Sequence, residues 1–438
     1  MKPRPSCYGS WPNNAPLKMV NGATPLQALP PVLMTSDPGS FARATIVDRK
    51  PQIIRRVVAD HAYPTEVVSA LDAFAHEIAS SVIQPPMASA EDAEARFWRD
   101  QWAQYAGRTW LELPWYFAET YFYRRMLEIV GYFDLGRWHA HDPFGPQKRV
   151  QEAEAIDQVA RVWPKIMAET GEARFVALLH ASLWGNRADL SNFTVRERAV
   201  GNGPGDREYI LIDHTDAVVR LLRSKRSPAR VAFVNDNVGA DSLFDLALSG
   251  FLLEQGWARH VTLHLKDRPF FVSDAMPADI VQMVDRLCSC SHVHLATLGR
   301  QLRDALTSGN LLLATDPFWS RSLCFEDLPE PLRAQLASND LIFVKGDVNY
   351  RRLLGDRRWP HTTPLESIST RFPRPFVALR TLKGEIMAGL KPGEADALAA
   401  QDPEWLINGK RGIIHLVEPD RRDQHQASPP TCPVNKRP

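Results

Sequence analysis

The sequence predicts an α/β fold, an α/β/α sandwich preceded by an all-helical N-terminal part. Apolar residues recur at spacings of three and four between about residues 45 and 184, which is typical of amphipathic helices. Later in the chain, short apolar runs rich in β-branched residues alternate with helical patterns. At 438 residues the chain is two to three times the usual domain size, so two domains are expected.

The two ends of the chain differ in composition from the rest. Residues 1–40 contain eight prolines and residues 418–438 contain five, with few periodic apolar positions. Such segments cannot bury enough apolar surface to offset their ordering entropy, so we expect disorder in both.

A helical N-terminal domain is expected over residues 41–200. Four segments carry its pattern, at 67–83, 95–107, 116–133 and 154–184. The glycine-rich stretch 201–205 (GNGPG) is expected to lie in a connecting loop.

An α/β/α domain is expected over residues 201–417. Its strand candidates are 209–213, 230–235, 260–266, 310–316, 340–347 and 375–381. Helical patterns such as 242–256 and 278–289 separate several of them, which favours a mostly parallel sheet with helices on both faces.

The charge balance excludes some classes of partner. With 52 Lys and Arg against 51 Asp and Glu, the net charge is +1, so we expect neither a nucleic-acid nor a membrane partner. The five cysteines are few and irregularly spaced, which favours a reducing compartment, and prolines occupy the N-terminal segment where a signal peptide would be apolar. We therefore expect a cytoplasmic protein.

Polar and charged residues follow several of the predicted strands. In open α/β sheets the ligand site lies outside the carboxyl ends of the strands. The residues expected to converge there are Asn235, Asp236, Asn237, Asp267, Asp274, Asp316, Asp347, Asn349, Arg351, Arg380 and Lys383. Any one of these could be a turn former or helix cap, but their repetition at successive strand ends indicates a site.

This set of residue types has a chemical meaning. Oxygen ligands from Asp and Asn suit Mg²⁺ or Mn²⁺, whereas a structural zinc site would use His or Cys. Arg and Lys beside such an ion suit a phosphate group. The pattern therefore favours metal-assisted hydrolysis of a phosphate ester.

At these residues the sequence resembles the damage-control phosphatases formerly called domain of unknown function 89, in the subfamily with an R-T-x-K motif. That motif reads Arg380-Thr381-Leu382-Lys383 here. The resemblance covers most of the chain between about residues 45 and 415, and its other motifs lie at 112–133, 182–191, 233–246, 263–276 and 340–359. Several long motifs in the same order are a specific signal.

The resemblance implies a Rossmann-like α/β/α domain and a metal-dependent phosphatase acting on sugar phosphates such as fructose 1-phosphate and fructose 6-phosphate. It implies a divalent metal (Mn²⁺, Co²⁺, Ni²⁺ or Mg²⁺) held by Asp236, Asn237 and Asp274. Substrate contacts would fall on Asp236, Asn237, Asp347, Val348, Asn349, Tyr350, Arg351 and Lys383, with Glu112 and Asn186 lining the site. In catalysis, Asp236, Asn237, Asp274 and Lys383 would act together.

One position departs from the family pattern. The family often reads D-N-x-G-x-E, and Asp241 stands at the acidic position here. Its shorter side chain keeps the charge and loses one methylene of reach. The sequence also leaves open whether water attacks the phosphorus directly or Asp236 first accepts the phosphoryl group.

Other functions remain as alternatives. The subfamily also carries an attribution as S-adenosylmethionine-dependent protein carboxyl methyltransferases acting on glutamate, but the glycine-rich stretch 201–205 precedes a strand instead of following one. A non-catalytic sugar-phosphate-binding module would use the same site chemistry. A haloacid-dehalogenase-type phosphatase is less favoured, since its D-x-D-x-[TV] motif follows none of the predicted strands.

Three further features have simpler interpretations. His139, His141 and Asp142 resemble a metal cluster but are expected in a surface or interdomain turn. The aromatic segment 115–123 is expected to pack in a core, with the adjoining Arg124 and Arg125 in ion pairs, and Cys288 and Cys290 are expected to be inert.

Overall fold

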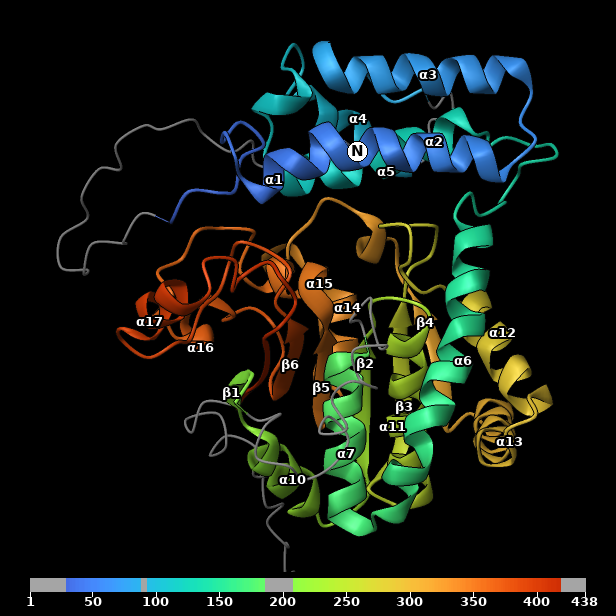
Figure 1. The fold of residues 1–438 in the computed structure, drawn as a ribbon, viewed down its shortest axis with the longest axis vertical. Helices are drawn as coiled ribbons and strands as arrows, with labels where there is room; N and C mark the ends of the chain where they lie inside the picture. The colour runs from blue at the N-terminus through green and yellow to red at the C-terminus, as the bar shows by residue number, and fades with distance from the viewer. Residues whose placement is uncertain (1–28, 88–92, 186–207, 419–438) are drawn as a thin grey trace, which may run out of the picture.

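The computed structural model describes residues 29–87, 93–185 and 208–418 (Figure 1). The protein is an α/β protein with one seven-stranded sheet, helices on both faces of the sheet, and a layer of helices across one end of it (Figure 1). We call this end layer, residues 41–129, the helical cap. The α/β/α sandwich that the sequence predicts is therefore confirmed.

The sheet is mostly parallel. The strands are β1 (Ile210–Asp213), β2 (Ala229–Val234), β3 (Ala258–Leu265), β4 (Leu311–Thr315), β5 (Leu341–Lys345), β6 (Phe376–Thr381) and β7 (Gly412–Val417). Their order in the sheet is β1-β7-β6-β5-β2-β3-β4, and only the β6–β7 pair is antiparallel. The carboxyl ends of β2 to β6 consequently meet at one edge, and those of β1 and β7 lie at the opposite edge.

The helices fall into three groups. The helical cap contains α1 (Phe41–Ala44), η1 (Thr45–Arg49), α2 (Lys50–Asp60), α3 (Thr65–Ser80), α4 (Ala93–Ala103), η2 (Trp110–Glu112) and α5 (Trp115–Ile129). One face of the sheet carries α6 (Gly145–Ala168), α7 (Gly171–Trp184), α10 (Thr215–Arg223), α11 (Ala240–Glu254), α12 (Pro277–Ser289) and α13 (Val293–Ser308). The other face carries η3 (Pro317–Ser320), η4 (Phe325–Asp327), α14 (Glu330–Ala337), α15 (Gly346–Leu353), α16 (Leu365–Ile368) and α17 (Glu394–Gln401).

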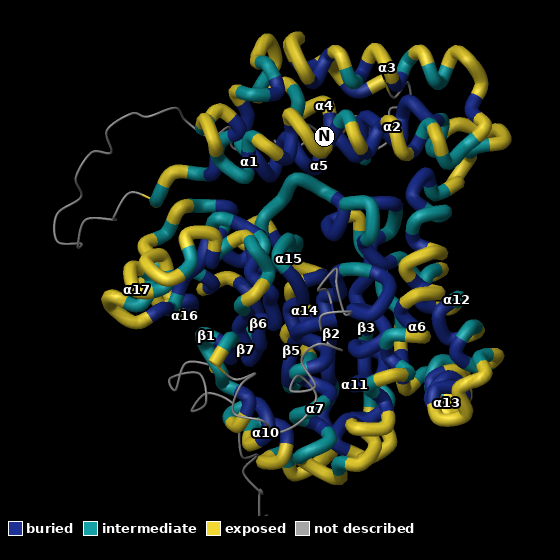
Figure 2. The backbone as a smooth tube through the Cα atoms, in the orientation of Figure 1, coloured by how far each residue is buried: buried dark blue, intermediate teal, exposed yellow. Residues whose placement is uncertain are grey.

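Side-chain alternation along the strands separates two hydrophobic cores. In β2, Val231 and Phe233 join the core that contains α6, α7 and α11, whereas Ala232 and Val234 join the core on the α15 side. All five residues of β5 are buried, as expected for a central strand covered on both faces (Figure 2). This double burial explains why these strands read as continuous apolar runs in the sequence.

The helical cap has a third core of its own, which also takes in Phe270 from the segment that follows β3. Two further contacts join the cap to the sheet edge. Trp115 of α5 lies over the guanidinium of Arg351 at 4.0 Å, and the Glu385 carboxylate accepts hydrogen bonds from the backbone N–H groups of Phe41 (3.1 Å) and Ala42 (3.3 Å). The cap is thus attached directly to segments that carry candidate site residues.

Several sequence-based expectations can be compared with these elements. All six predicted strands are present, but β7 was not anticipated, and β1 runs antiparallel to the central strands. The single helical pattern at 154–184 is divided into α6 and α7 at Glu169–Thr170, before Gly171 with φ +53°. The domain boundaries at 41–200 and 201–417 remain a prediction, and α6 and α7 pack with α11 on the sheet.

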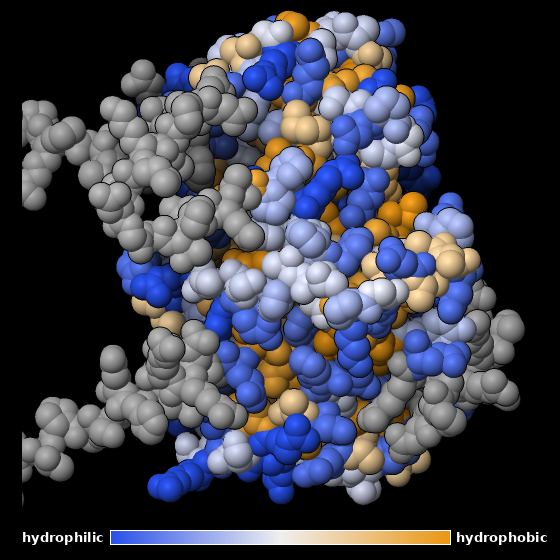
Figure 3. All heavy atoms as spheres, turned by 90° about the vertical axis from the view of Figure 1, so that its left-hand side faces the viewer, coloured by the Kyte–Doolittle hydropathy of each residue, from blue (hydrophilic) through white to orange (hydrophobic). Residues whose placement is uncertain are grey.

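Most of the two expected disordered ends, and the loop 201–205, lie outside the described residues. Within 29–40, Leu33 is fully buried, and isolated bridges pair Val32 with Arg357 and Met34 with Pro114. Among the described residues, no helix is long and apolar enough to cross a membrane. On the face shown in Figure 3, hydrophilic side chains are spread over the height of the molecule, with hydrophobic ones between them.

We expect Phe233→Ala to lower the free energy of unfolding by about 3–5 kcal/mol, because the Phe233 ring is fully buried and stacks on Phe343 at 4.5 Å. Chemical denaturation measures this loss. Leu312→Ala, at a residue of β4 that is 44% exposed, should cost under about 1 kcal/mol. Equal losses in the two variants would contradict the assigned core.

Candidate functional site

The candidate site lies where the chain direction across the sheet reverses. Strand β2 is followed by α11, which packs on one face of the sheet, and its neighbour β5 is followed by α15, which packs on the other. Connections that diverge to opposite faces leave a crevice between neighbouring strand ends, the usual ligand site of such sheets. Asp236 and Asn237 follow β2, and Asp347 follows β5. The structure thus brings some of the predicted strand-end residues to this crevice, and the site itself remains a prediction.

The loops after β2 and β3 are hydrogen-bonded side by side. The N–H of Ala275 donates to the carbonyl of Asp236 (2.9 Å), the N–H of Val238 donates to the carbonyl of Ser273 (2.7 Å), and Asn237 pairs with Asp274 in an isolated bridge. This pairing brings together the three residues expected as metal ligands, Asp236, Asn237 and Asp274. The Asn237 amide donates to Asp236 Oδ2 (2.7 Å), and the Ser273 hydroxyl donates to Asn237 Oδ1 (2.6 Å).

The two carboxylates of this group are buried and repel each other. Asp236 is 4% exposed and Asp274 1%. Burial raises the pKa of Asp236 well above its ordinary value, and the charges of Asp274 and Asp241 raise it further. Burial also raises the pKa of Asp274, and Lys266, whose Nζ lies 3.3 Å from Asp274 Oδ2, opposes that shift. A pair of carboxylates in this state is stabilised by an added positive charge.

The donor atoms available at this position are oxygens. Over the described part of the chain, no three or more His, Cys, Asp and Glu side chains are grouped so that they could hold a metal ion. A cation here would therefore need the Asn237 amide oxygen beside the two aspartates. Such a donor set suits hard cations such as Mg²⁺ or Mn²⁺.

Backbone geometry at Gly346 determines the position of Asp236. Gly346 begins α15 with φ +80°, and a Cβ added there would lie 1.9 Å from Asp236 Oδ2. A side chain at position 346 and the observed Asp236 carboxylate are therefore mutually exclusive. Glycine keeps the ends of β2 and β5 close enough to share the site.

Asp347 holds two arginines. Its Oδ2 accepts from Arg351 Nε (2.8 Å), and its Oδ1 accepts from Arg380 Nε (2.7 Å). Burial alone would raise the pKa of Asp347, but Arg380 and Arg351 lower it to about 2. Arg380 also donates to the carbonyls of Ile386 (2.6 Å) and Gly384 (3.1 Å), so it fixes the segment that follows Lys383.

Lys383 is the cation that the R-T-x-K motif places at this edge. Burial lowers its pKa, while the negative charges of Asp236, Asp241 and Asp347 raise it, so all three carboxylates act on the Lys383 ammonium. Arg49 of the helical cap also acts on the pKa of Lys383, which places the cap close to the site. The sequence-based grouping of Lys383 with Asp236 and Asp347 agrees with this geometry.

Other predicted substrate contacts are buried in the scaffold. Asn349 is 0% exposed, and its amide donates to the carbonyls of Asn235 (3.0 Å) and Lys345 (2.9 Å). Tyr350 is 0% exposed, and its hydroxyl accepts from the Ala388 N–H (3.2 Å). Arg351 is also 0% exposed, whereas Val348 is half-buried on α15. Asn349, Tyr350 and Arg351 thus hold neighbouring segments in place.

The two residues expected to line the site have different outcomes. Glu112 is exposed, and its carboxylate accepts from the Thr109 N–H and hydroxyl (2.8 Å each) in a capping box on η2. The structure does not bring Glu112 together with the strand-end residues. Asn186 lies outside the described residues.

The histidines, cysteines and aromatic residues with simpler interpretations make local contacts or lie exposed. His139 and His141 are exposed in a loop, and Asp142 lies 2.9 Å from Lys148. Cys288 and Cys290 are free thiols, and Asp316 caps η3 by accepting from the Phe318 N–H (2.8 Å). Within the aromatic segment, most side chains are core residues, but Trp115 also covers Arg351.

Two buried lysines of the site were not anticipated. Lys266 pairs with Asp274, and Lys345 lies 2.8 Å from Asp245 and 3.1 Å from Asp241. Lys266 directly follows the buried end of β3, and Lys345 is the last residue of the buried strand β5. A lysine in that position must find a carboxylate partner to remain charged, and this pattern in the sequence could have identified both.

The site therefore combines buried carboxylates and an amide with a nearby cation. Asp236, Asn237 and Asp274 lie together at the ends of β2 and β3, and the charge of Lys383, which follows β6, acts on Asp236. Such an arrangement can hold a cation and an anionic group next to each other.

Comparisons with known proteins show which family this chain resembles. A family model described as the damage-control phosphatase ARMT1-like domain matches residues 45–398. The damage-control phosphatase ARMT1 of Danio rerio is 30% identical over 447 residues, covering 90% of this chain and 98% of that protein. The protein of the same name from Mus musculus is 30% identical, covering 89% and 99%. Among solved structures, a DUF89 family protein from Pyrococcus horikoshii aligns with a TM-score of 0.45 and 14% identity over 86% of this chain and 97% of its own.

We expect Gly346→Ala to destabilise the protein by more than the backbone strain alone, because the new methyl group overlaps the Asp236 carboxylate. Gly393→Ala is the matched control, since Gly393 has φ +79° and nothing within 4 Å of its added Cβ. The control should cost about 1–2 kcal/mol, and Gly346→Ala should cost clearly more in chemical denaturation. A crystal structure of Gly346→Ala with Asp236 unmoved would refute this reading.

Asp347→Asn should make stability less dependent on pH in acid. Because the pKa of Asp347 is lowered to about 2, its ionised form contributes stability above the ordinary pKa, and this contribution is lost as the pH falls toward 2. The contribution amounts to about 2 kcal/mol. Urea denaturation at pH 5 and at lower pH should show that the free energy of unfolding falls less steeply with decreasing pH in Asp347→Asn than in the unsubstituted protein. Parallel declines would contradict the role of Asp347.

Proposed function

The chain belongs to the damage-control phosphatase ARMT1-like family, and we propose that it is a divalent-metal-dependent phosphatase that hydrolyses sugar phosphates such as fructose 1-phosphate and fructose 6-phosphate. Family membership supports the phosphatase class. The observation that carries the finer proposal is the buried pair Asp236 and Asp274 at the β2–β5 crevice, with the charge of Lys383 acting on Asp236.

The residues present fit a divalent cation. Asp236, Asn237 and Asp274 would hold it, because they supply oxygen donors and an excess of buried negative charge at one place. A bound Mn²⁺, Co²⁺, Ni²⁺ or Mg²⁺ would withdraw charge from the phosphoryl oxygens of the substrate. Lys266, 3.3 Å from Asp274, opposes the rise in the pKa of that carboxyl and so favours its ionised form.

Lys383 is the residue that we assign to the phosphoryl group. The charges of Asp236, Asp241 and Asp347 act on its ammonium, which would pair with the phosphoryl oxygens and neutralise charge that develops in the transition state. Arg380 anchors the Gly384–Ile386 segment and thereby holds Lys383 in place. We assign Asp347 to positioning the two arginines, since both of its carboxylate oxygens are engaged by them.

The helical cap would restrict access of water to the crevice. Trp115 covers the Arg351 guanidinium. Phe270 packs in the core of the cap and so anchors the segment between β3 and Asp274. Electrostatic interactions are stronger where water is excluded, so the cap would increase the effect of Lys383 on a bound phosphate.

Asp236→Ala should reduce phosphate release by at least about a thousandfold, because a carboxylate that contacts the reacting group is lost. The assay measures inorganic phosphate from fructose 1-phosphate with added Mn²⁺, and circular dichroism verifies folding. Asp316→Ala is the matched control, a strand-end aspartate after β4 that caps η3. We expect it to keep activity within about twofold and lose about 1 kcal/mol of stability. Full turnover by Asp236→Ala would rule out the assignment.

The same preparation separates the alternatives. A rise in melting temperature with Mn²⁺ and none with S-adenosylmethionine supports the phosphatase over a protein carboxyl methyltransferase. A panel of phosphorylated sugars, each tested with Mn²⁺, Co²⁺, Ni²⁺ and Mg²⁺, identifies the preferred substrate and metal. Binding of these sugars without release of phosphate would indicate a non-catalytic binding module.

A further inference from the structure

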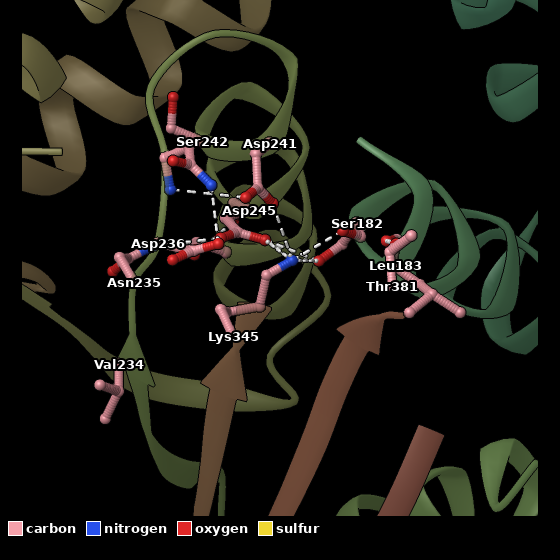
Figure 4. Close-up of polar contacts among 12 residues, drawn as sticks. Ser182, Leu183, Val234, Asn235, Asp236, Asp241, Ser242, Asp245, Lys345 and Thr381 are labelled. Carbon is pink, nitrogen blue, oxygen red and sulfur yellow. Dashed lines mark hydrogen bonds and ion pairs between the residues drawn. The ribbon is translucent and has the colours of Figure 1, made fainter. Parts of the chain in front are cut away.

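A buried lysine at the end of β5 lies next to the candidate site and is engaged by groups of the protein itself. Lys345 is the last residue of β5, directly before Gly346, and it is 2% exposed. Its Nζ lies 2.6 Å from Ser182 Oγ, 2.7 Å from the Ser182 carbonyl, 2.8 Å from Asp245 and 3.1 Å from Asp241 (Figure 4). An ammonium group has three N–H donors. These four oxygens therefore occupy Lys345 completely, and no donor is left for a substrate.

The partners of Lys345 lead directly to the predicted metal ligands. Asp245 Oδ2 accepts from the Asn235 amide (3.1 Å), and Asn235 precedes Asp236 in the chain. The other carboxylate, Asp241, has its Oδ2 3.5 Å from the Asn237 N–H. Lys345 is thus connected to both sides of the Asp236–Asn237 turn.

The same lysine also joins the end of α7 to the sheet. Ser182 donates to Asp245 Oδ1 (2.6 Å), and the carbonyl of the next residue, Leu183, accepts from Thr381 Oγ1 (2.9 Å). Thr381 lies two residues before Lys383. The chain just after α7 packs tightly against the start of α11, since a Cβ added at Gly185 would lie 2.9 Å from the Cα of Asp241.

The buried negative charge around the end of β2 must be balanced by positive groups. Four buried aspartates gather around the end of β2, namely Asp236, Asp241, Asp245 and Asp274. The positive charge of Lys345 balances the negative charges of Asp241 and Asp245, the two carboxylates next to the Asp236–Asn237 turn. Without it, Asp241 and Asp245 would either take up protons or turn toward other partners, and the Asp236–Asn237 turn would lose its support.

We infer that Lys345 is a positioning residue of the phosphatase site, which fixes Asp241 and Asp245 and through them holds Asp236 and Asn237 in the arrangement that binds a divalent cation. The inference rests on the proposed function. It distinguishes Lys345 from Lys383, which we assign to the phosphoryl group, and it predicts that the effect of Lys345 is seen first in cation binding.

The test measures Mn²⁺ binding by titration calorimetry, with Mn²⁺ alone as the probe. Lys345→Met should weaken Mn²⁺ binding at least tenfold and lower kcat more than it raises KM for fructose 1-phosphate. Raising the Mn²⁺ concentration should restore part of the lost rate. Unchanged Mn²⁺ affinity in a folded Lys345→Met protein would overturn the inference.

The matched control is Lys50→Met. Lys50 is also buried, at 0% exposed, and it pairs with the Glu119 carboxylate inside the helical cap, so neither residue follows a strand of the crevice. It should lower the melting temperature to a similar extent and keep Mn²⁺ affinity within about twofold. Equal weakening of Mn²⁺ binding in both lysine variants would show a general loss of structure and would also overturn the inference.

Ser182→Ala provides a second variant in case Lys345→Met does not fold. It removes one oxygen at 2.6 Å from Lys345 and leaves every charge in place. A smaller weakening of Mn²⁺ binding, in the same direction, supports the inference, and unchanged binding contradicts it. If the unsubstituted protein binds Mn²⁺ but releases no phosphate from any ester, the proposed function fails, and the Mn²⁺ titrations still decide the role of Lys345.

Discussion

The burial of several negative charges at the carboxyl edge of the sheet is the constraint on which the rest of the site depends. Carboxylates in a poorly hydrated environment are costly unless positive groups balance them. Asp274 has Lys266, Asp241 and Asp245 share Lys345, and Asp347 has Arg351 and Arg380. Asp236 is the carboxylate whose pKa is raised most clearly by its acidic neighbours. The side chains around it divide into those that balance charge within the protein and those that we propose to bind the metal ion and the substrate.

This division explains how the fold and the site depend on each other. The strands are held by two cores that alternate along each strand, so their ends lie at fixed positions. Glycine at position 346 lets the ends of the parallel strands β2 and β5 approach closely, and the connections that leave these two strands toward opposite faces of the sheet open the crevice between their loops. The helical cap then closes over this edge through Trp115 and Phe270. The strand ends carry the candidate site residues, and the helical cap covers them.

Much of this arrangement follows from the sequence, for identifiable reasons. Strands buried on both faces give short apolar runs that are easily recognised, and residues after parallel strands must meet at one edge, which is why Asp236, Asp274 and Lys383 could be grouped. The direction of β1 and the pairing of β7 could not be predicted, because side-chain periodicity carries no information on strand order or direction. Glu112 belongs to a sequence motif, but its capping of η2 depends on local backbone geometry. Asn349 resembles a ligand-binding side chain in the sequence, and only the structure shows that backbone carbonyls occupy its amide.

The hydrogen bonds between Glu385 and the start of α1 have a consequence for observing the protein in solution. The Glu385 carboxylate accepts from the amides of Phe41 and Ala42, and Glu385 lies two residues after Lys383. Amide hydrogens exchange with solvent deuterium when their hydrogen bonds open. The exchange rates of these two amides, more than three hundred residues away in the chain, therefore report on displacement of the segment that carries Lys383, without any label introduced near the crevice.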